Sequence, residues 1–226
     1  MRCAGLSALI FVFAALVAHA ENGKYSIKTA DTAPPKAISE SIRKLLDKQS
    51  VQLLSPDGKQ LAEVWLRSSV PADATPEQIK NGITYREIKQ SEIIGVIRFD
   101  QDTADYRKQK VKAGTYTLRL GYQPADGDHQ GSSLHKEFLV LVDPAKDTKP
   151  DLIDYKEMVE LSMKTINTGH PAVFMLFPVP KPGPAPRLEA KAMNHWVLNT
   201  REEITVDGKK TGRRIGIGIT LVGHAQ

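Results

Sequence analysis

The clearest strand signal in the chain is the stretch Val111-Lys112-Ala113-Gly114-Thr115-Tyr116-Thr117-Leu118-Arg119-Leu120. Gly114 allows a tight turn into the strand, because glycine adopts backbone conformations that other residues avoid. After it, apolar residues at 116, 118 and 120 alternate with polar residues at 115, 117 and 119. A period of two is typical of a strand that buries one face. We therefore expect a half-buried strand here, with Leu118 in the core.

Further strand signals lie on both sides of this stretch. They cover residues 51–54, 59–67, 93–99, 138–142, 172–177, 196–198, 204–206 and 215–221. The turn Ser55-Pro56-Asp57-Gly58 joins the first two segments into a hairpin. About eight to ten strands at short intervals, without a βαβ rhythm, indicate a mainly β protein. We expect an antiparallel β-sandwich, immunoglobulin-like or prealbumin-like, with two short helices.

Those two helices are predicted from apolar spacing. From Lys36 onward, Ile38, Ile42, Leu45 and Leu46 share one helical face. The second helix is predicted over residues 151–166, with Asp151 as its N-cap. In the last strand, Gly216 and Gly218 alternate with isoleucines, which predicts that other backbone approaches this face closely.

Residues 1–20 have the pattern of a signal peptide. Arg2 precedes an apolar stretch from Ala4 to Ala18, and Ala18-His19-Ala20 supplies small residues at a cleavage site. We expect cleavage after Ala20, a flexible leader over residues 21–35 and a single sandwich domain over residues 36–226. The expected location is the bacterial periplasm or the cell exterior.

The composition of the mature chain excludes several classes of protein. The chain's one cysteine, Cys3, lies in the signal peptide, so the mature protein has no disulfide and no thiolate site. Without Arg2, 30 basic and 26 acidic residues leave a net charge of +4. This mild, dispersed excess does not predict nucleic acid as a partner. No later segment is long and apolar enough for a transmembrane span.

Several stretches together resemble a family of uncharacterised secreted bacterial β-rich proteins. The resemblance rests on Gly114-Thr115-Tyr116-Thr117-Leu118-Arg119 followed by Gln123-Pro124-Ala125-Asp126-Gly127-Asp128-His129, with Glu63-Val64-Trp65-Leu66-Arg67 before them and Gly169-His170-Pro171 after them. It covers most of the mature chain. It implies export and a β-rich fold, and it implies no activity.

The segment from Asp126 to His135 is the first candidate site. Asp126, Asp128, His129 and His135 bring two carboxylates and two imidazoles into ten residues. Carboxylate oxygen and neutral imidazole are ligands of divalent transition metals such as zinc, copper and manganese. The same composition also suits a solvated turn, because Asp and Gly are common in turns. His170 is the second candidate, either as a further ligand or as an imidazole that stabilises a turn.

Motifs for catalysis are missing from the sequence, including the nucleophile elbow, the Ser-x-x-Lys motif, the zinc-protease helix and the phosphate loop. Four aromatic residues, Trp65, Tyr85, Tyr106 and Tyr122, would suit carbohydrate stacking if they were exposed. The leading hypothesis is an exported, non-catalytic binding or accessory protein of the cell envelope, with an envelope protein or carbohydrate as partner. The alternatives are a periplasmic metal-binding protein that uses His129 and neighbouring acids, and a hydrolase of envelope or extracellular polymer.

Overall fold

The computed structural model describes residues 24–126, 133, 135–179 and 183–225. Its strands are β1 (Ser26–Ala30), β2 (Ser50–Leu54), β3 (Gln60–Leu66), β4 (Ser69–Pro71), β5 (Ile93–Phe99), β6 (Thr103–Ala104), β7 (Lys110–Val111), β8 (Gly114–Tyr122), β9 (Glu137–Val142), β10 (Phe174–Phe177), β11 (Arg187–Lys191), β12 (His195–Val206) and β13 (Lys209–Val222). The α-helices are α1 (Glu40–Arg43), α2 (Pro76–Asn81) and α3 (Tyr155–Ile166).

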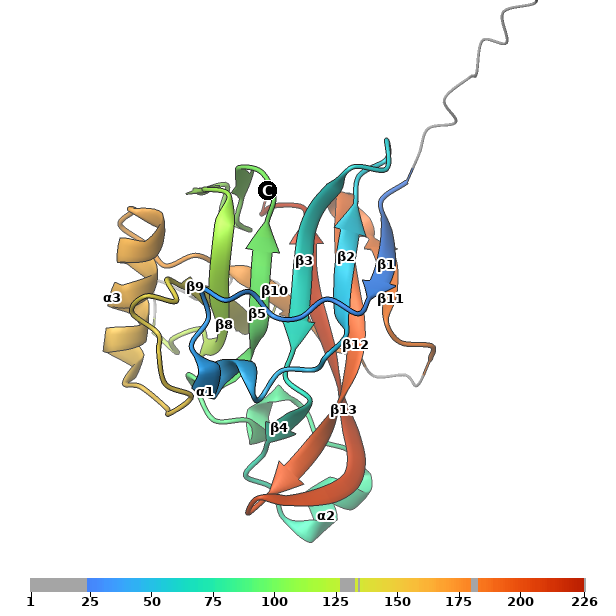
Figure 1. The fold of residues 1–226 in the computed structure, drawn as a ribbon. Coiled ribbons are helices and arrows are strands. Elements are labelled where there is room, and N and C mark those ends of the chain that lie inside the picture. Colours follow the sequence, from blue (N-terminus) through green and yellow to red (C-terminus); the bar gives the residue numbers. More distant parts are fainter. Residues whose placement is uncertain (1–23, 127–132, 134, 180–182, 226) are drawn as a thin grey trace, which may run out of the picture.

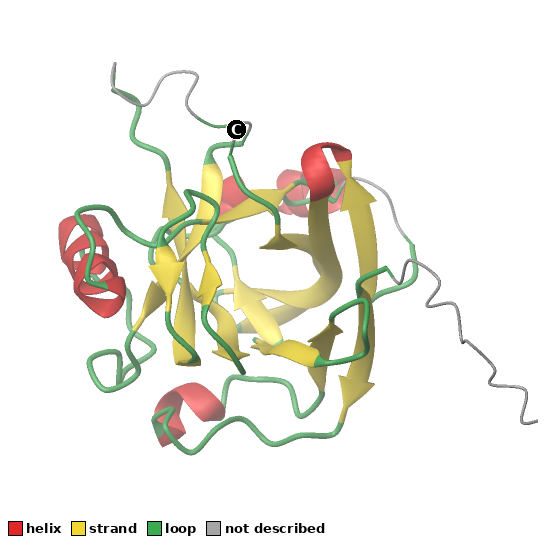
Figure 2. Cartoon of the chain, turned by 90° about the horizontal axis from the view of Figure 1, so that it is seen from above, coloured by secondary structure: helices red, strands yellow, loops and turns green. Residues whose placement is uncertain are grey.

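Most of the strands belong to one curled sheet. Its hydrogen-bonded order is β1-β2-β3-β5-β8-β9-β10-β13-β12-β11, with β4 attached to β12, and β6 and β7 form a separate small sheet. The curl brings β1 close to β11, so that the strands surround a common interior (Figure 2). The mainly β prediction is confirmed. The expected division into the two sheets of a sandwich is not, because β10 pairs with both β9 and β13 and keeps the sheet continuous.

The inside of the curl is the main hydrophobic core. Leu118 and Leu120 of β8 are fully buried there, together with Leu139 of β9 and Ile217 of β13. Alternation along β8 places these side chains on one face, as the sequence predicts. Burying a leucine or isoleucine side chain contributes about 1.5–3 kcal/mol, so this set of residues is the chief source of stability.

Two helices cover the outer face of the same sheet (Figure 1). The segment around α1 places Ile38 and Ile42 against Trp65, which is fully buried. On another side, α3 packs Met158 against Val140 and Val142 of β9. The β strands of the central part of the sheet are therefore buried on both faces, which explains the continuous apolar run in β5.

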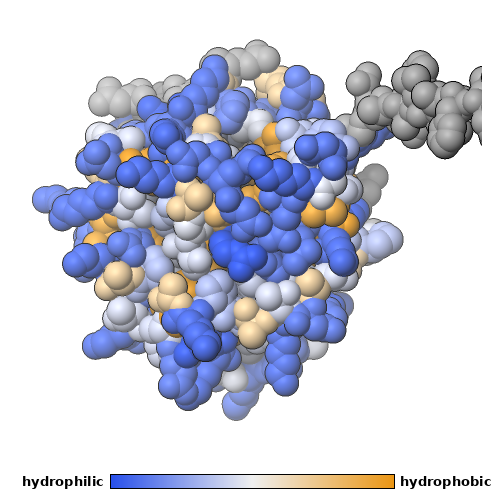
Figure 3. Space-filling model, turned by 45° about the horizontal axis from the view of Figure 1, so that its top comes forward, coloured by the Kyte–Doolittle hydropathy of each residue, from blue (hydrophilic) through white to orange (hydrophobic). Residues whose placement is uncertain are grey.

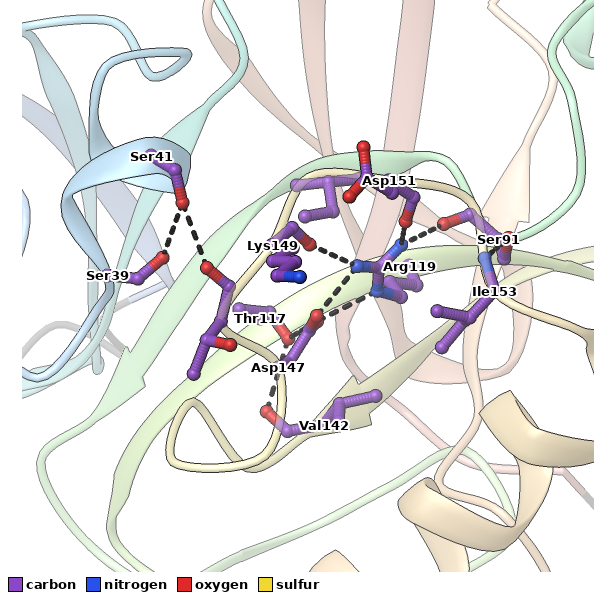
Figure 4. A network of polar contacts seen from close by, with 12 residues as sticks. Ser39, Ser41, Ser91, Thr117, Arg119, Val142, Asp147, Lys149, Asp151 and Ile153 are labelled. Atoms are coloured by element: carbon purple, nitrogen blue, oxygen red, sulfur yellow. Dashed lines mark hydrogen bonds and ion pairs between the residues drawn. The ribbon is translucent and has the colours of Figure 1, made fainter.

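Arg119 departs from the prediction of a half-buried strand, because it is fully buried on the outer face of β8. Its guanidinium pairs with Asp147 at 2.6 and 2.8 Å and donates to the carbonyls of Ser91, Lys149 and Asp151 (Figure 4). A buried arginine is tolerated only when its donors are satisfied in this way. The alternating pattern shows which face Arg119 is on, but not that residues 147–151 fold over that face.

The same network corrects the predicted start of the second helix. Helix α3 begins at Tyr155, and its N-cap is Asp154, whose carboxylate accepts from the backbone N–H of Lys156 at 2.8 Å. The prediction of Asp151 as N-cap is wrong, because the Asp151 carbonyl accepts a hydrogen bond from Arg119. Residues 151–153 are therefore part of the cover over Arg119 instead of the first helical turn.

Part of the expected flexible leader is an ordered strand. β1 pairs antiparallel with β2 over its whole length, from Ser26 opposite Leu54 to Ala30 opposite Ser50. Beyond β1, the indole N–H of Trp65 donates to the carbonyl of Thr32 at 2.6 Å. The leader prediction relied on Pro34 and Pro35 and on few apolar residues, and an edge strand needs few apolar residues when its backbone is paired.

The last strand confirms the expected close approach of other backbone. A methyl group at Gly218 would lie 2.6 Å from the Phe177 carbonyl oxygen, and one at Gly216 would lie 2.6 Å from Val179. β13 can therefore pack against the end of β10 only with glycine at these positions. Among the described residues, no helix has the length and apolar character needed to cross a membrane.

Candidate functional site

A cavity of about 410 Å³ lies between α3 and the outer face of the sheet; we call it the helix cavity. Segments from distant parts of the chain line it: residues 106–107, 123–124, 135–138, 155–163 and 169–173, with Ala225 near the C-terminus. Its volume falls within the roughly 300–1,000 Å³ of small-molecule sites. On the face seen in Figure 3, hydrophobic residues form only small separate patches, so that face offers no broad apolar docking surface.

Asp105 holds one side of the helix cavity in place. Its buried carboxylate accepts from the backbone N–H groups of Arg107, Gln109 and Val173, at 2.8–2.9 Å. The Gln109 side chain donates to the same carboxylate at 2.7 Å. These bonds connect the loop between β6 and β7 to the segment before β10. As a result, Tyr106 and Arg107 are held at the cavity wall by a residue that does not line it.

Helix α3 forms the opposite wall. It presents Tyr155, Lys156, Val159 and Met163, whose spacing places them along one side of a helix. The buried hydroxyl of Ser162 accepts from the backbone N–H of Ala172 at 3.1 Å, which fixes the helix to the start of β10. Both walls therefore join the same segment, residues 171–173.

The charged groups of the helix cavity are mostly cationic. Arg107 and Lys156 line it, and no described lining residue is acidic. Among the described residues, neither cation takes part in a salt bridge. Asp126 lies near enough to Tyr155 to raise the pKa of its phenol, although burial is the larger cause of that rise. The arrangement suits an apolar ligand that carries an anionic group.

Two of the predicted metal ligands come together in this cavity. His135 and His170 both line it, although 35 residues separate them in the sequence. Burial lowers the pKa of His135, and its ring meets Phe177 edge-on with centroids 4.6 Å apart. The Nδ1–H of His170 donates to the Pro171 carbonyl at 2.9 Å, so this nitrogen carries a proton. The lowered pKa of His135 favours its neutral form, which is the form that coordinates metal.

The remaining predicted ligands do not extend this pair within the described chain. Asp128 and His129 lie outside the described residues. Asp126 is described but is not among the residues that line the cavity. In the part of the chain that the structure describes, no group of three or more His, Cys, Asp or Glu residues is placed to hold a metal ion. Of the predicted ligands, the structure thus places His135 and His170 at the helix cavity.

The aromatic residues expected to be exposed are not available for sugar stacking. Trp65, Tyr85 and Tyr106 are buried, with exposed fractions of 0%, 6% and 8%. Tyr122 is partly buried, and its hydroxyl donates to the carbonyls of Tyr85 and Ile88. Burial raises the pKa of the Tyr106 phenol, and its ring stacks on His195 at 5.3 Å. These rings pack in the interior, because the curled sheet encloses one face of its strands and helices cover much of the other.

Sequence reasoning missed Arg107, Lys156 and Asp105. Arg107 and Lys156 stand in charged segments that look like ordinary surface, and Asp105 looks like a turn residue. A signal was available for Asp105, because Asp commonly accepts from backbone N–H groups two residues onward in a turn. No local pattern indicates that Arg107 and Lys156 face one cavity.

No family model, no curated protein and no solved structure matches this chain. The resemblance to secreted bacterial proteins therefore stays a prediction. Function has to be argued from the geometry of the chain itself.

Proposed function

We propose that the mature protein is exported and binds a small amphipathic anion in the helix cavity. The observation that carries this proposal is the combination of apolar walls with two cations, Arg107 and Lys156, that have no acidic partner among the described lining residues. An apolar body would pack against Phe138, Val159 and Met163. A carboxylate head would pair with the cations and gain a charge-assisted hydrogen bond. The protein acts by binding, without catalysis.

Dodecanoate and dodecanol test this proposal, since they share a hydrocarbon chain and differ in the head group. Titration calorimetry on the mature protein should show binding of dodecanoate and weaker binding of dodecanol by about tenfold or more, because a hydrogen bond to a charged group contributes about 1.5–3 kcal/mol. Lys156→Gln and Arg107→Gln should each weaken dodecanoate binding and leave dodecanol binding unchanged.

Lys164→Gln is the matched control. Lys164 belongs to the same helix, pairs with Glu160 at 3.9 Å and does not line the cavity. The substitution should leave dodecanoate binding as in the wild type. Equal affinity for the two probes, or no binding of either, would contradict the proposal.

A divalent transition metal is the second candidate ligand, because His135 and His170 line the same cavity. Zinc should then raise the melting temperature of the mature protein, and His135→Ala or His170→Ala should each remove that rise. Binding should weaken as the pH falls through the pKa values of the histidines, since only a neutral imidazole coordinates metal. If zinc has no effect on either variant or the wild type, the metal proposal fails and the anion proposal is unaffected.

Export is tested separately. Cleavage after Ala20 should leave Glu21 as the first residue of protein recovered from the periplasm or the medium. N-terminal sequencing checks this, and an intact Met1 would contradict export through a cleaved signal peptide.

A further inference from the structure

A second cavity, of about 360 Å³, lies where the two ends of the curled sheet face each other; we call it the seam cavity. On one side, β2 and β3 contribute Ser50, Val51, Val64 and Leu66, and on the other side β12 contributes residues 200–202. On this edge of β12, β11 pairs only as far as Asn199, and β4 begins its pairing at Glu203. The cavity therefore opens at a gap in the strand pairing.

Glu202 is the buried acid of the seam cavity. It lines the cavity and is 8% exposed, and in the described chain its carboxylate makes no salt bridge. Burying a charged group without a counter-ion is unfavourable. Burial, helped by the Asp47 carboxylate, raises the pKa of Glu202 to about 7, although the Thr200 hydroxyl and the Arg214 guanidinium lower it.

The other buried carboxylates of the described chain show how unusual this is. Glu63 pairs with Arg98 at 2.6 Å, Asp147 pairs with Arg119 at 2.6 Å, and Glu92 pairs with Arg67. Asp105 has no arginine, but it accepts several N–H donors. Each of these four buried carboxylates is thus satisfied by an arginine or by N–H donors of the chain itself. Glu202, by contrast, forms no salt bridge with any of the described residues.

Charges of both signs surround this group. Asp47 precedes β2 and lines the seam cavity, as do Arg201 of β12 and Arg214 of β13. Within the described residues, none of the three forms a salt bridge, and the buried Nε of Arg201 has no hydrogen-bond partner. Two acidic and two basic residues therefore line one space, and among the described residues no salt bridge joins them. A ligand with one charge would satisfy only half of them.

We propose that the seam cavity binds a small zwitterion of the amino-acid class, whose ammonium group pairs with Glu202 and Asp47 and whose carboxylate pairs with Arg214 and Arg201. A metal cation would match the two carboxylates but not the two arginines. This site is separate from the helix cavity and does not depend on the function proposed for it.

Calorimetric titration of the mature protein with the standard amino acids and with glycylglycine tests the proposal. At least one of these probes should bind. Its methyl ester keeps the ammonium, and its N-acetyl form keeps the carboxylate; each should bind about tenfold more weakly or worse, because each loses one charge-assisted contact. Glu202→Gln and Arg214→Gln should weaken the zwitterion to a similar degree. Glu203→Gln is the control, since Glu203 is the next residue and pairs with Lys210 at 2.8 Å.

The pH dependence gives a readout that does not rely on the variants' stability. Affinity of the wild type should fall by up to about tenfold for each pH unit below the pKa of Glu202, because protonation removes the charge that the ammonium needs. Asp47, Arg201 and Arg214 are the other charged residues that line this space. Absence of binding by every probe, or binding that Glu202→Gln leaves unchanged, would overturn the proposal.

Discussion

A buried carboxylate without a counter-ion makes the stability of a protein depend on pH. Glu202 has a pKa of about 7 in the folded chain, against an ordinary value of 4.5. The folded state therefore holds a proton that the unfolded state releases between these values, and the free energy of unfolding falls as the pH rises through this range. The shift corresponds to about 3 kcal/mol lost between pH 4 and pH 8.

Glu202→Gln should remove this dependence, because glutamine does not titrate. We expect the variant to be more stable than the wild type at pH 8, by up to about 3 kcal/mol, and similar to it near pH 4. Urea unfolding at the two pH values measures both. Glu203→Gln should leave the pH dependence of the wild type in place, and an identical response of both variants would show that Glu202 is solvated.

Arg119 illustrates what an alternating sequence pattern can and cannot indicate about a single residue. Alternation in β8 correctly assigns Arg119 to the face opposite Leu118. It does not reveal that Arg119 is fully buried, because the Ser91 carbonyl lies 28 residues before it, and Asp147 and the Lys149 carbonyl lie 28 and 30 residues after it. Charge normally indicates exposure, and that rule fails where segments distant in the sequence supply the acceptors.

At the scale of elements, the helix cavity depends on helix α3, which forms one of its walls. Asp154→Ala should lower the free energy of unfolding by about 1 kcal/mol, because the first backbone N–H groups of α3 lose their acceptor. It should also weaken dodecanoate binding, since Lys156 and Val159 lie within the first turns. Asp151→Ala is the matched control and should have little effect, because Asp151 contributes its carbonyl and not its side chain to the Arg119 network. Thermal unfolding and titration of both variants decide which aspartate caps the helix.

At the scale of the whole molecule, the stability of the curled sheet depends on its edge strand β1. Deletion of residues 21–35 should destabilise the protein, because β2 would lose one of its two partner strands and Trp65 would lose the Thr32 carbonyl. A buried donor left unpaired costs about 1–3 kcal/mol, and β2 would become an exposed edge that favours aggregation. A lower denaturation midpoint for this deletion is the expected result. Deletion of residues 21–24 alone leaves β1 in place and should leave the midpoint unchanged. Equal midpoints for both deletions would support a flexible leader.

Most of the longer strands, the hairpin turns and the apolar faces could be predicted from the sequence, because they depend on neighbours one to four residues apart. The edge strand β1 could not, because its residues carry no apolar alternation. The alternation in residues 115–120, the turn at Asp57-Gly58 and the glycines at 216 and 218 all lie in such local patterns. The number of sheets could not be predicted in this way. It depends on whether β10 pairs with β13 as well as with β9, and this is settled by packing across the entire chain.

The candidate sites, too, depend partly on what the sequence shows locally and partly on what only the tertiary structure shows. The sequence identified His135 and His170 as chemically capable residues, because imidazole is uncommon and versatile. Only the tertiary structure brings them to one cavity with Arg107 and Lys156, and only the tertiary structure buries Glu202 opposite Asp47. The physical reason is that charge and polarity are properties of a side chain, whereas burial and the lack of a counter-ion are properties of the surfaces that folding brings together.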